Sequence, residues 1–180
     1  MRVGVAALLS CGRQVGVVWG LALVLLSGIA SAQQTISTTV TGPVYGNGNS
    51  ITVTTSGTID GSVTGSGVIS TGTNTTTTLT NAGTISGAVW GASLSTTGTV
   101  TNSAGAVIHG GSRGGLATIG NVGLIDNAGL IDGGFYGMHT QSSGTVTTLT
   151  NSGTIQGGSY GGVVRMTSGT LTNSGLFTGT

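Results

Sequence analysis

A nine-residue pattern that recurs six times between residues 51 and 180 constrains the fold of this chain more than any other feature. Its clearest copies are Leu-Thr-Asn-Ala-Gly-Thr-Ile-Ser-Gly at 79–87 and Leu-Thr-Asn-Ser-Gly-Thr-Ile-Gln-Gly at 149–157. The central glycine recurs at intervals of 26, 22, 24, 24 and 22 residues, as Gly57, Gly83, Gly105, Gly129, Gly153 and Gly175. A period of about 20–50 residues is typical of a solenoid, a propeller or another repeat array.

Alternating side chains within each copy indicate a short strand, a turn and a second strand. In Thr78–Asn81, Leu79 points to one face while the threonines beside it point to the other. We expect Asn81 to return to the interior at the turn, Gly83 to adopt a left-handed conformation, and Ile85 to enter the core from the second strand. One copy cannot bury its two aliphatic side chains alone, so the copies must stack about 4.8 Å apart.

Stacking predicts three internal ladders, in which equivalent side chains of successive rungs lie on one another. Two ladders are aliphatic, and the third consists of asparagines whose amides bond the next rung and the turn backbone. The aliphatic ladders comprise Leu79, Val100, Ile125, Leu149 and Leu171, and Ile85, Ile108, Ile131, Ile155 and Phe177; the third comprises Asn81, Asn102, Asn127, Asn151 and Asn173. We therefore interpret these asparagines as structural rather than ligand-binding.

The composition selects a β-structure among the repeat folds. The 180 residues include 37 glycines and 33 threonines but no lysine or glutamate, and glycine and threonine are poor helix formers. Propeller blades need about 40 residues, leucine-rich repeats need a different leucine spacing, and calcium-binding nonapeptide repeats need recurrent aspartate. The sequence therefore predicts an all-β fold, a right-handed parallel β-helix (β-solenoid) of about six rungs of 22–26 residues.

The first 32 residues have the character of a secretory signal. An apolar run of 15 residues, 15–29, follows two arginines and ends in Ala30-Ser31-Ala32, small residues that a signal peptidase accepts. We predict cleavage before Gln33. Two alternatives are an uncleaved anchor and a lipoprotein-type cleavage at Cys11, although the stronger apolar run follows that cysteine.

Removal of residues 1–32 changes the chemistry of the chain. The mature part has no cysteine, so it cannot form disulfides, and it carries two arginines against three aspartates, a net charge of −1. No basic patch remains to hold a phosphate backbone, so we expect no nucleic-acid partner.

A looser repeat after the second strand supplies the candidate site. Residues 89–91, 112–114, 135–137 and 159–161 align, which places one large side chain on each rung: Trp90, Arg113, Tyr136 and Tyr160, spaced 23, 23 and 24 residues apart. If these side chains point outward, they form a binding column of the kind that glycan or peptide sites use. Alternatively, the rings stack on one another or pack against the core for structural reasons.

Paired threonines form a second outward array. A Thr-x-Thr sequence occurs at 78–80, 99–101, 148–150 and 170–172, and Leu124 and Asp126 interrupt it at the rung between. Two threonine rows on a flat face resemble the ice-binding surface of some antifreeze β-solenoids, which leaves an ice- or surface-binding role as an alternative. Threonine is also simply a good exposed strand residue.

The residues needed for catalysis do not form a recognisable set. The mature chain lacks a cysteine and a G-x-S-x-G segment, and we expect His109 and His139 to be separate solvated loop residues. Asp126 and Asp132 are expected on opposite sides of one turn, which gives only weak support to a glycan-acting β-helix enzyme. We therefore predict a protein that is not an enzyme and uses no metal or cofactor.

The unit Thr-Leu-Thr-Asn-Ser-Gly-Thr-Ile-x-Gly, seen at 148–157 and nearly so at 78–87, resembles the passenger repeats of Gram-negative autotransporters (type V secretion). The resemblance covers residues 51–180 and, through the signal, the N-terminus. It implies export through the inner membrane to the cell surface or outer membrane, or secretion, and a structural or adhesive role in attachment, biofilm formation or host contact. The implied partner is a host-surface or biofilm glycan or protein.

The resemblance also sets expectations for the ends of the chain. An autotransporter passenger precedes a membrane barrel of amphipathic strands, and residues up to Thr180 contain none, so we expect a C-terminally truncated product. Membrane contact would require that missing barrel, and an open solenoid end would invite self-association. The predicted divisions are a signal at 1–32, an N-terminal cap or lead-in at 33–50, and repeats at 51–180.

Overall fold

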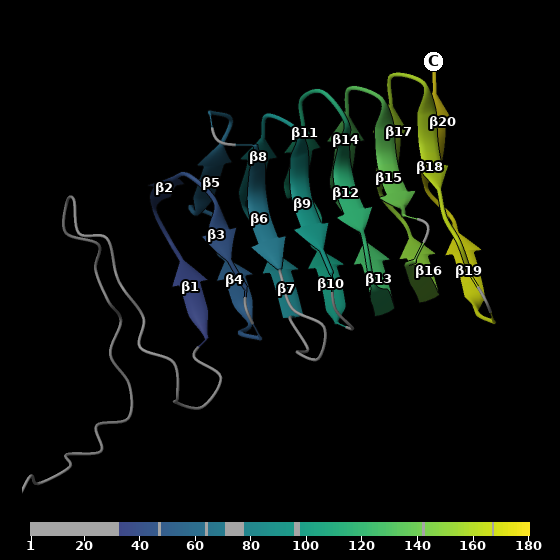
Figure 1. Ribbon diagram of the computed structural model, residues 1–180, viewed down its shortest axis with the longest axis horizontal. Helices are drawn as coiled ribbons and strands as arrows, with labels where there is room; N and C mark the ends of the chain where they lie inside the picture. The colour runs from purple at the N-terminus through teal and green to yellow at the C-terminus, as the bar shows by residue number, and fades with distance from the viewer. Residues whose placement is uncertain are drawn as a thin grey trace, which may run out of the picture.

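The computed structural model describes residues 33–180 except residues 47, 64, 71–77, 96–97, 142 and 167. The predicted signal and its two alternatives lie outside the described residues. Within them the chain coils through three parallel sheets, A, B and C, which run side by side along one axis (Figure 1). In this part of the chain no helix is long and apolar enough to cross a membrane.

Each described turn of the coil contributes one strand to each sheet, except the last, which contributes only to sheets A and B, and the strand pairs are parallel. Sheet A contains β1 (Gln34–Ile36), β4 (Ile51–Val53), β7 (Thr78–Asn81), β10 (Thr99–Asn102), β13 (Asn121–Asn127), β16 (Thr145–Asn151) and β19 (Thr170–Asn173). Sheet B contains β2 (Thr39–Thr41), β5 (Thr58–Gly61), β8 (Thr84–Gly87), β11 (Val107–Gly110), β14 (Leu130–Gly133), β17 (Thr154–Gly157) and β20 (Leu176–Gly179). Sheet C contains β3 (Val44–Tyr45), β6 (Ser66–Ser70), β9 (Trp90–Leu94), β12 (Gly114–Thr118), β15 (Tyr136–Thr140) and β18 (Tyr160–Val163).

The predicted right-handed parallel β-helix is confirmed, and its strand register places the two aliphatic ladders as expected. Leu79 pairs with Val100 on sheet A, and Ile85 pairs with Ile108 on sheet B. Residues 33–50 form a rung of their own, because β1, β2 and β3 pair in parallel with β4, β5 and β6. The stacking therefore starts one rung before the first copy of the nine-residue pattern.

The core is a continuous column of aliphatic side chains enclosed by the three sheets. The ladder residues from Leu79 to Leu149 and from Ile85 to Ile155 are fully buried, and sheet C adds Leu116 and Met138. Burial of one such side chain stabilises the fold by about 1.5–3 kcal/mol. Leu171, in the last described rung, is 55% exposed because no further rung covers it among the described residues.

The left-handed conformation predicted for Gly83 is wrong. Among the described glycines, φ is positive only at Gly42, Gly48, Gly65 and Gly105. Gly83 is required for a different reason, since a Cβ there would collide with the carbonyl oxygens of Gly57 and Thr54 in the rung before. The recurring glycine thus permits close stacking of successive turns, whereas Gly105, with φ +80°, sits in a longer turn that bends sharply.

Candidate functional site

Aromatic side chains form a stacked column on the outer face of sheet C. The strand register aligns Ser66, Trp90, Gly114, Tyr136 and Tyr160 on successive rungs. The Trp90 and Tyr136 rings are parallel within 9° with centroids 6.5 Å apart, and Tyr136 and Tyr160 stack at 5.6 Å. The Trp90 ring reaches over Gly114, where a Cβ would come within 2.5 Å of its Cζ3 atom. A side chain at position 114 would therefore separate the rings.

The placement of Arg113 in this column is wrong by one residue. Gly114 pairs with Trp90 and with Tyr136, so Arg113 lies in the turn before β12. Its backbone carbonyl accepts hydrogen bonds from the N–H groups of Phe135 and Tyr136. The sequence spacing misled because 114 and 115 are both glycine, which allowed the recurring glycine to be aligned with the wrong one of the two.

Exposure of the rings increases along the column. Trp90 is only 6% exposed, Tyr136 is half-buried, and Tyr160 is 52% exposed. Phe135, on the turn before Tyr136, meets the rings of Tyr136 and Tyr160 edge to face at 4.6 and 5.6 Å. The column therefore has a structural end at Trp90 and an accessible end at Tyr160.

His139 joins this cluster, so its predicted position in a solvated loop is wrong. It lies in β15, and its ring stacks on Tyr136 at 4.5 Å and on Trp90 at 6.0 Å. Strict alternation would not bring residues 136 and 139 to the same face, but Gly137 and Met138 are both buried in succession. A Cβ on Gly137 would lie 2.7 Å from the backbone N and O atoms of Gln156, so the strand bends inward there. The Tyr-Gly pairs at 136–137 and 160–161 were the available signal.

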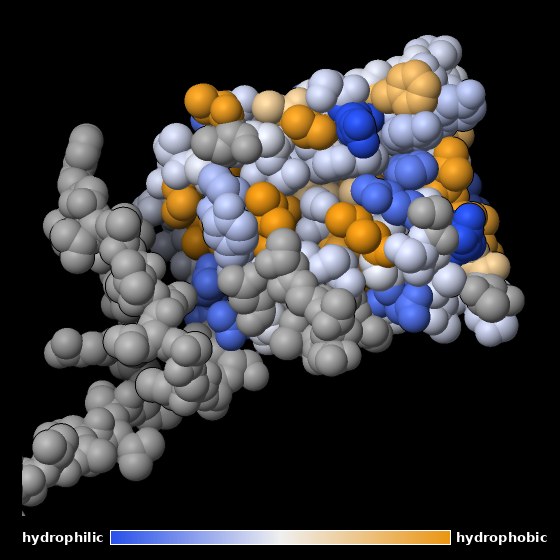
Figure 2. Space-filling view, in the orientation of Figure 1, coloured by the Kyte–Doolittle hydropathy of each residue, from blue (hydrophilic) through white to orange (hydrophobic). Residues whose placement is uncertain are grey.

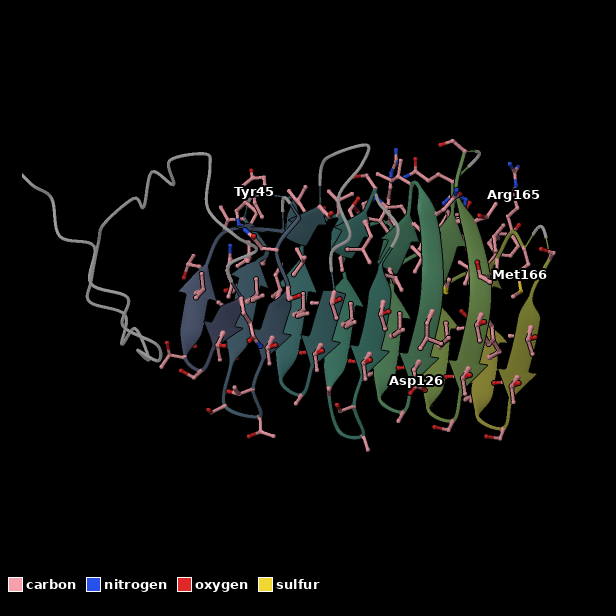
Figure 3. All side chains as sticks on the ribbon, turned by 90° about the horizontal axis from the view of Figure 1, so that it is seen from below. Tyr45, Asp126, Arg165 and Met166 are labelled. Carbon is pink, nitrogen blue, oxygen red and sulfur yellow. The ribbon has the colours of Figure 1, made fainter. Side chains whose placement is uncertain are left out.

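An open groove of about 690 Å³ runs beside these rings. Its lining includes Trp90, Phe135, Tyr136 and His139 together with the guanidinium side chains of Arg113 and Arg165. On the face seen in Figure 2, strongly hydrophilic and hydrophobic residues lie side by side toward the C-terminal half of the solenoid. Arg165 lies at the end of the molecule far from Tyr45, along the same edge (Figure 3). We call this surface the sheet C groove.

The sheet C groove is positively charged. No described carboxylate lines it: Asp126 is on sheet A, and Asp60 and Asp132 are on sheet B. Burial, together with the nearby Arg113 guanidinium, lowers the pKa of His139 from its ordinary value of 6.5, so the imidazole is neutral at pH 7. Its Nδ1 atom is buried and has no hydrogen-bond partner among the described residues.

The five predicted ladder asparagines stack at the corner between sheets A and B. Each Nδ2 donates to the Oδ1 of the next, at 2.9, 2.8, 2.7 and 2.7 Å in order from Asn81 to Asn173. The same amides donate to backbone carbonyls of the following rung, for example from Asn102 to Leu130 O at 3.1 Å. The first four asparagines, from Asn81 to Asn151, are buried, and their side-chain amides already make these hydrogen bonds. They therefore have no hydrogen-bonding group left for a ligand.

A smaller polar cluster lies on sheet B. His109 is in strand β11 rather than in the expected loop, and its Nδ1 is 2.8 Å from Asp132 Oδ2 on the next rung. Gln156 donates from Nε2 to Asp132 Oδ1 at 3.2 Å. Asp126 lies on sheet A and Asp132 lies on sheet B, so these two carboxylates, although close in the sequence, do not share a site. No group of three or more metal-ligating side chains is found in the described part of the chain.

The outward threonines of sheet A lie in register along the solenoid. One row runs Thr35, Thr52, Thr80, Thr101, Asp126, Thr150, Thr172, and a second runs Thr78, Thr99, Leu124, Thr148, Thr170. Figure 3 shows this face with short oxygen-tipped side chains in rows and with Asp126 among them. The interruption expected at Leu124 and Asp126 is therefore central in the array.

No protein-family model, curated protein or solved structure matches this chain. Fold and surface define it as a parallel β-solenoid with one aromatic, arginine-containing groove on sheet C and threonine rows on sheet A.

Proposed function

We propose that this chain is an exported cell-surface passenger of the autotransporter type, non-catalytic and adhesive, which attaches to glycans through the sheet C groove. The observation that carries the proposal is the column of stacked rings beside two arginines. The β-solenoid fold, the signal-like N-terminus and the resemblance of the repeat to autotransporter passengers support the cellular setting.

The groove suits an extended polymer better than a small ligand. It is open and follows the solenoid axis from the rung of Trp90 to the rung of Tyr160, three rung spacings or about 14 Å. Aromatic rings offer flat apolar faces against which sugar C–H groups pack, while the polar rim bonds hydroxyl groups. Neighbouring rungs therefore present a repeated surface to a repeated ligand.

Attachment tests the proposal directly. Cells displaying the Tyr136→Ala, Tyr160→Ala double variant should bind immobilised glycans about tenfold more weakly than cells displaying the unchanged protein. Tyr45→Ala is the matched control, because Tyr45 is 49% exposed on the same sheet but lies outside the groove. Circular dichroism should show unchanged β-content in both variants. Equal attachment by all three proteins would refute the groove as the adhesive surface.

A second candidate, ice or surface binding, is favoured by one observation, the register of the threonine rows on sheet A. Purified protein would then lower the freezing point relative to the melting point of ice, and replacing Thr148 and Thr150 by tyrosine would abolish the effect. Absence of thermal hysteresis in the unchanged protein would eliminate this candidate.

A further inference from the structure

We propose that the ligand of the sheet C groove is an acidic polysaccharide, held by its uronate carboxylates. This inference rests on the proposed function and names the class of glycan. Its basis is the distribution of charge on the solenoid together with the rings and the unpartnered His139 nitrogen.

All the permanent positive charge of the described chain converges on this one groove. The chain has four arginines and no lysine, and two of the arginines, Arg2 and Arg13, precede the described residues. The other two, Arg113 and Arg165, both line the sheet C groove. The three aspartates lie on sheets A and B. A solenoid with a net negative charge after residue 32 therefore presents a cationic groove on one side, which attracts an anionic polymer.

The two guanidinium groups bracket the rings. Arg113 precedes β12 and Arg165 follows β18, two rungs later and at the opposite end of the strands of sheet C. A polymer that crosses the groove diagonally passes from one arginine over Tyr136 and His139 to the other. Each guanidinium presents a planar fork that matches a carboxylate in geometry and in charge.

His139 supplies a polar group in the middle of this path. Its ring stacks against both Tyr136 and Trp90, and its buried Nδ1 has no hydrogen-bond partner in the described structure. A neutral imidazole has one donor and one acceptor nitrogen and so can bond a sugar hydroxyl. Stacked rings recognise the sugar, and the arginines recognise its charge.

The test compares oligogalacturonate with its methyl ester, which has the same rings without the charge. Titration calorimetry with the full chain should show that the acid form binds about tenfold more tightly at low salt. Rising salt should weaken binding of the acid form and leave binding of the ester unchanged. The Arg113→Gln, Arg165→Gln double variant should bind the acid form only as well as the ester.

Controls separate this inference from the proposed function. Asp60→Asn changes the net charge on sheet B, outside the groove, and should leave both affinities unchanged. Equal binding of acid and ester overturns the acidic-glycan inference but leaves a glycan-binding groove. Binding of poly-aspartate as tight as that of oligogalacturonate also overturns it, because charge alone would then suffice. If neither form of the oligosaccharide binds, this inference fails, and the attachment assay with the tyrosine variants decides the proposed function independently.

Discussion

The corner between sheets A and B and the outer face of sheet C differ in how strictly the residue type repeats from rung to rung. At the corner the same residue types recur on successive rungs, with asparagine stacked on asparagine from Asn81 to Asn173. On sheet C one register position holds serine, tryptophan, glycine and tyrosine in turn. A buried amide must be satisfied on every rung, whereas an outward position carries no such requirement. Variation along a column therefore marks the surface that stacking leaves available for function.

The largest effect should follow from crowding the corner. Gly83→Ala places a methyl group against the carbonyl oxygens of Gly57 and Thr54, and should lower the free energy of unfolding by about 4 kcal/mol in urea titration. Gly123→Ala is the control, since its nearest non-neighbouring atom would be 3.6 Å away and φ is not left-handed. That variant should stay within about 1 kcal/mol of the unchanged protein. Similar losses in both would contradict the packing argument.

Breaking the asparagine ladder should lower the free energy of unfolding somewhat less than crowding the corner does. Asn127→Ala leaves the Asn102 amide donor without its 2.8 Å acceptor and the Asn151 carbonyl without its 2.7 Å donor, and should destabilise by about 3 kcal/mol. Asn121→Ala on the same strand removes an exposed amide that accepts only from Thr145 among the described bonds, and should cost below about 0.5 kcal/mol. Chemical denaturation of the two variants side by side measures the difference.

The aromatic column should show a gradient between structure and surface. Trp90→Leu removes a buried ring that covers Gly114 and should destabilise by about 2 kcal/mol. Tyr160→Leu, at the exposed end, should change stability by less than about 0.5 kcal/mol. Equal losses at the two positions, measured by thermal and chemical unfolding, would show that the whole column is structural.

The smallest effect should be a pH dependence that arises from His139. Its pKa is lowered in the folded state by burial and by Arg113, so the unfolded chain takes up a proton first as the pH falls. Arg165 and the Tyr136 phenol also face this groove. The stability is complete above the ordinary value of 6.5, declines below it, and levels off below the lowered folded pKa. His139→Gln should flatten this decline below pH 6.5, and an unchanged slope would contradict the assignment.

The sequence was sufficient to predict the rungs, the inward ladders and the asparagine register. These depend on alternation and on a period repeated six times, so an error in one copy is corrected by the others. Residues 33–50 were not recognised as a rung because Gln34 stands where later rungs carry an aliphatic side chain. The role of Gly83 was predicted wrongly, because the spacing of a recurring glycine does not show whether it adopts a left-handed conformation or allows two backbones to approach closely.

Sheet C was less predictable for a physical reason. A strand that bends at Gly137 breaks the two-residue alternation, and the Tyr-Gly pairs at 136–137 and 160–161 are a weak signal of that bend in the sequence. His139 was therefore missed, and Arg113 was placed one residue away from the register that Gly114 occupies. Tyr136 and Tyr160 were placed correctly on one column because the Tyr-Gly pair itself repeats. The sequence indicated which residues recur but not how the strands turn between them.

The asparagine bonds all run in one direction, from the amide of an earlier rung to the carbonyl of the next, across 21, 25, 24 and 22 residues. Each completed turn thus presents an asparagine amide N–H whose acceptor lies within the next two dozen residues. No distant part of the chain is needed to form that hydrogen bond. Closing a loop of that length costs little more for the last turn than for the first. Once one pair of turns has formed, the stack can therefore grow turn by turn as the polypeptide becomes available.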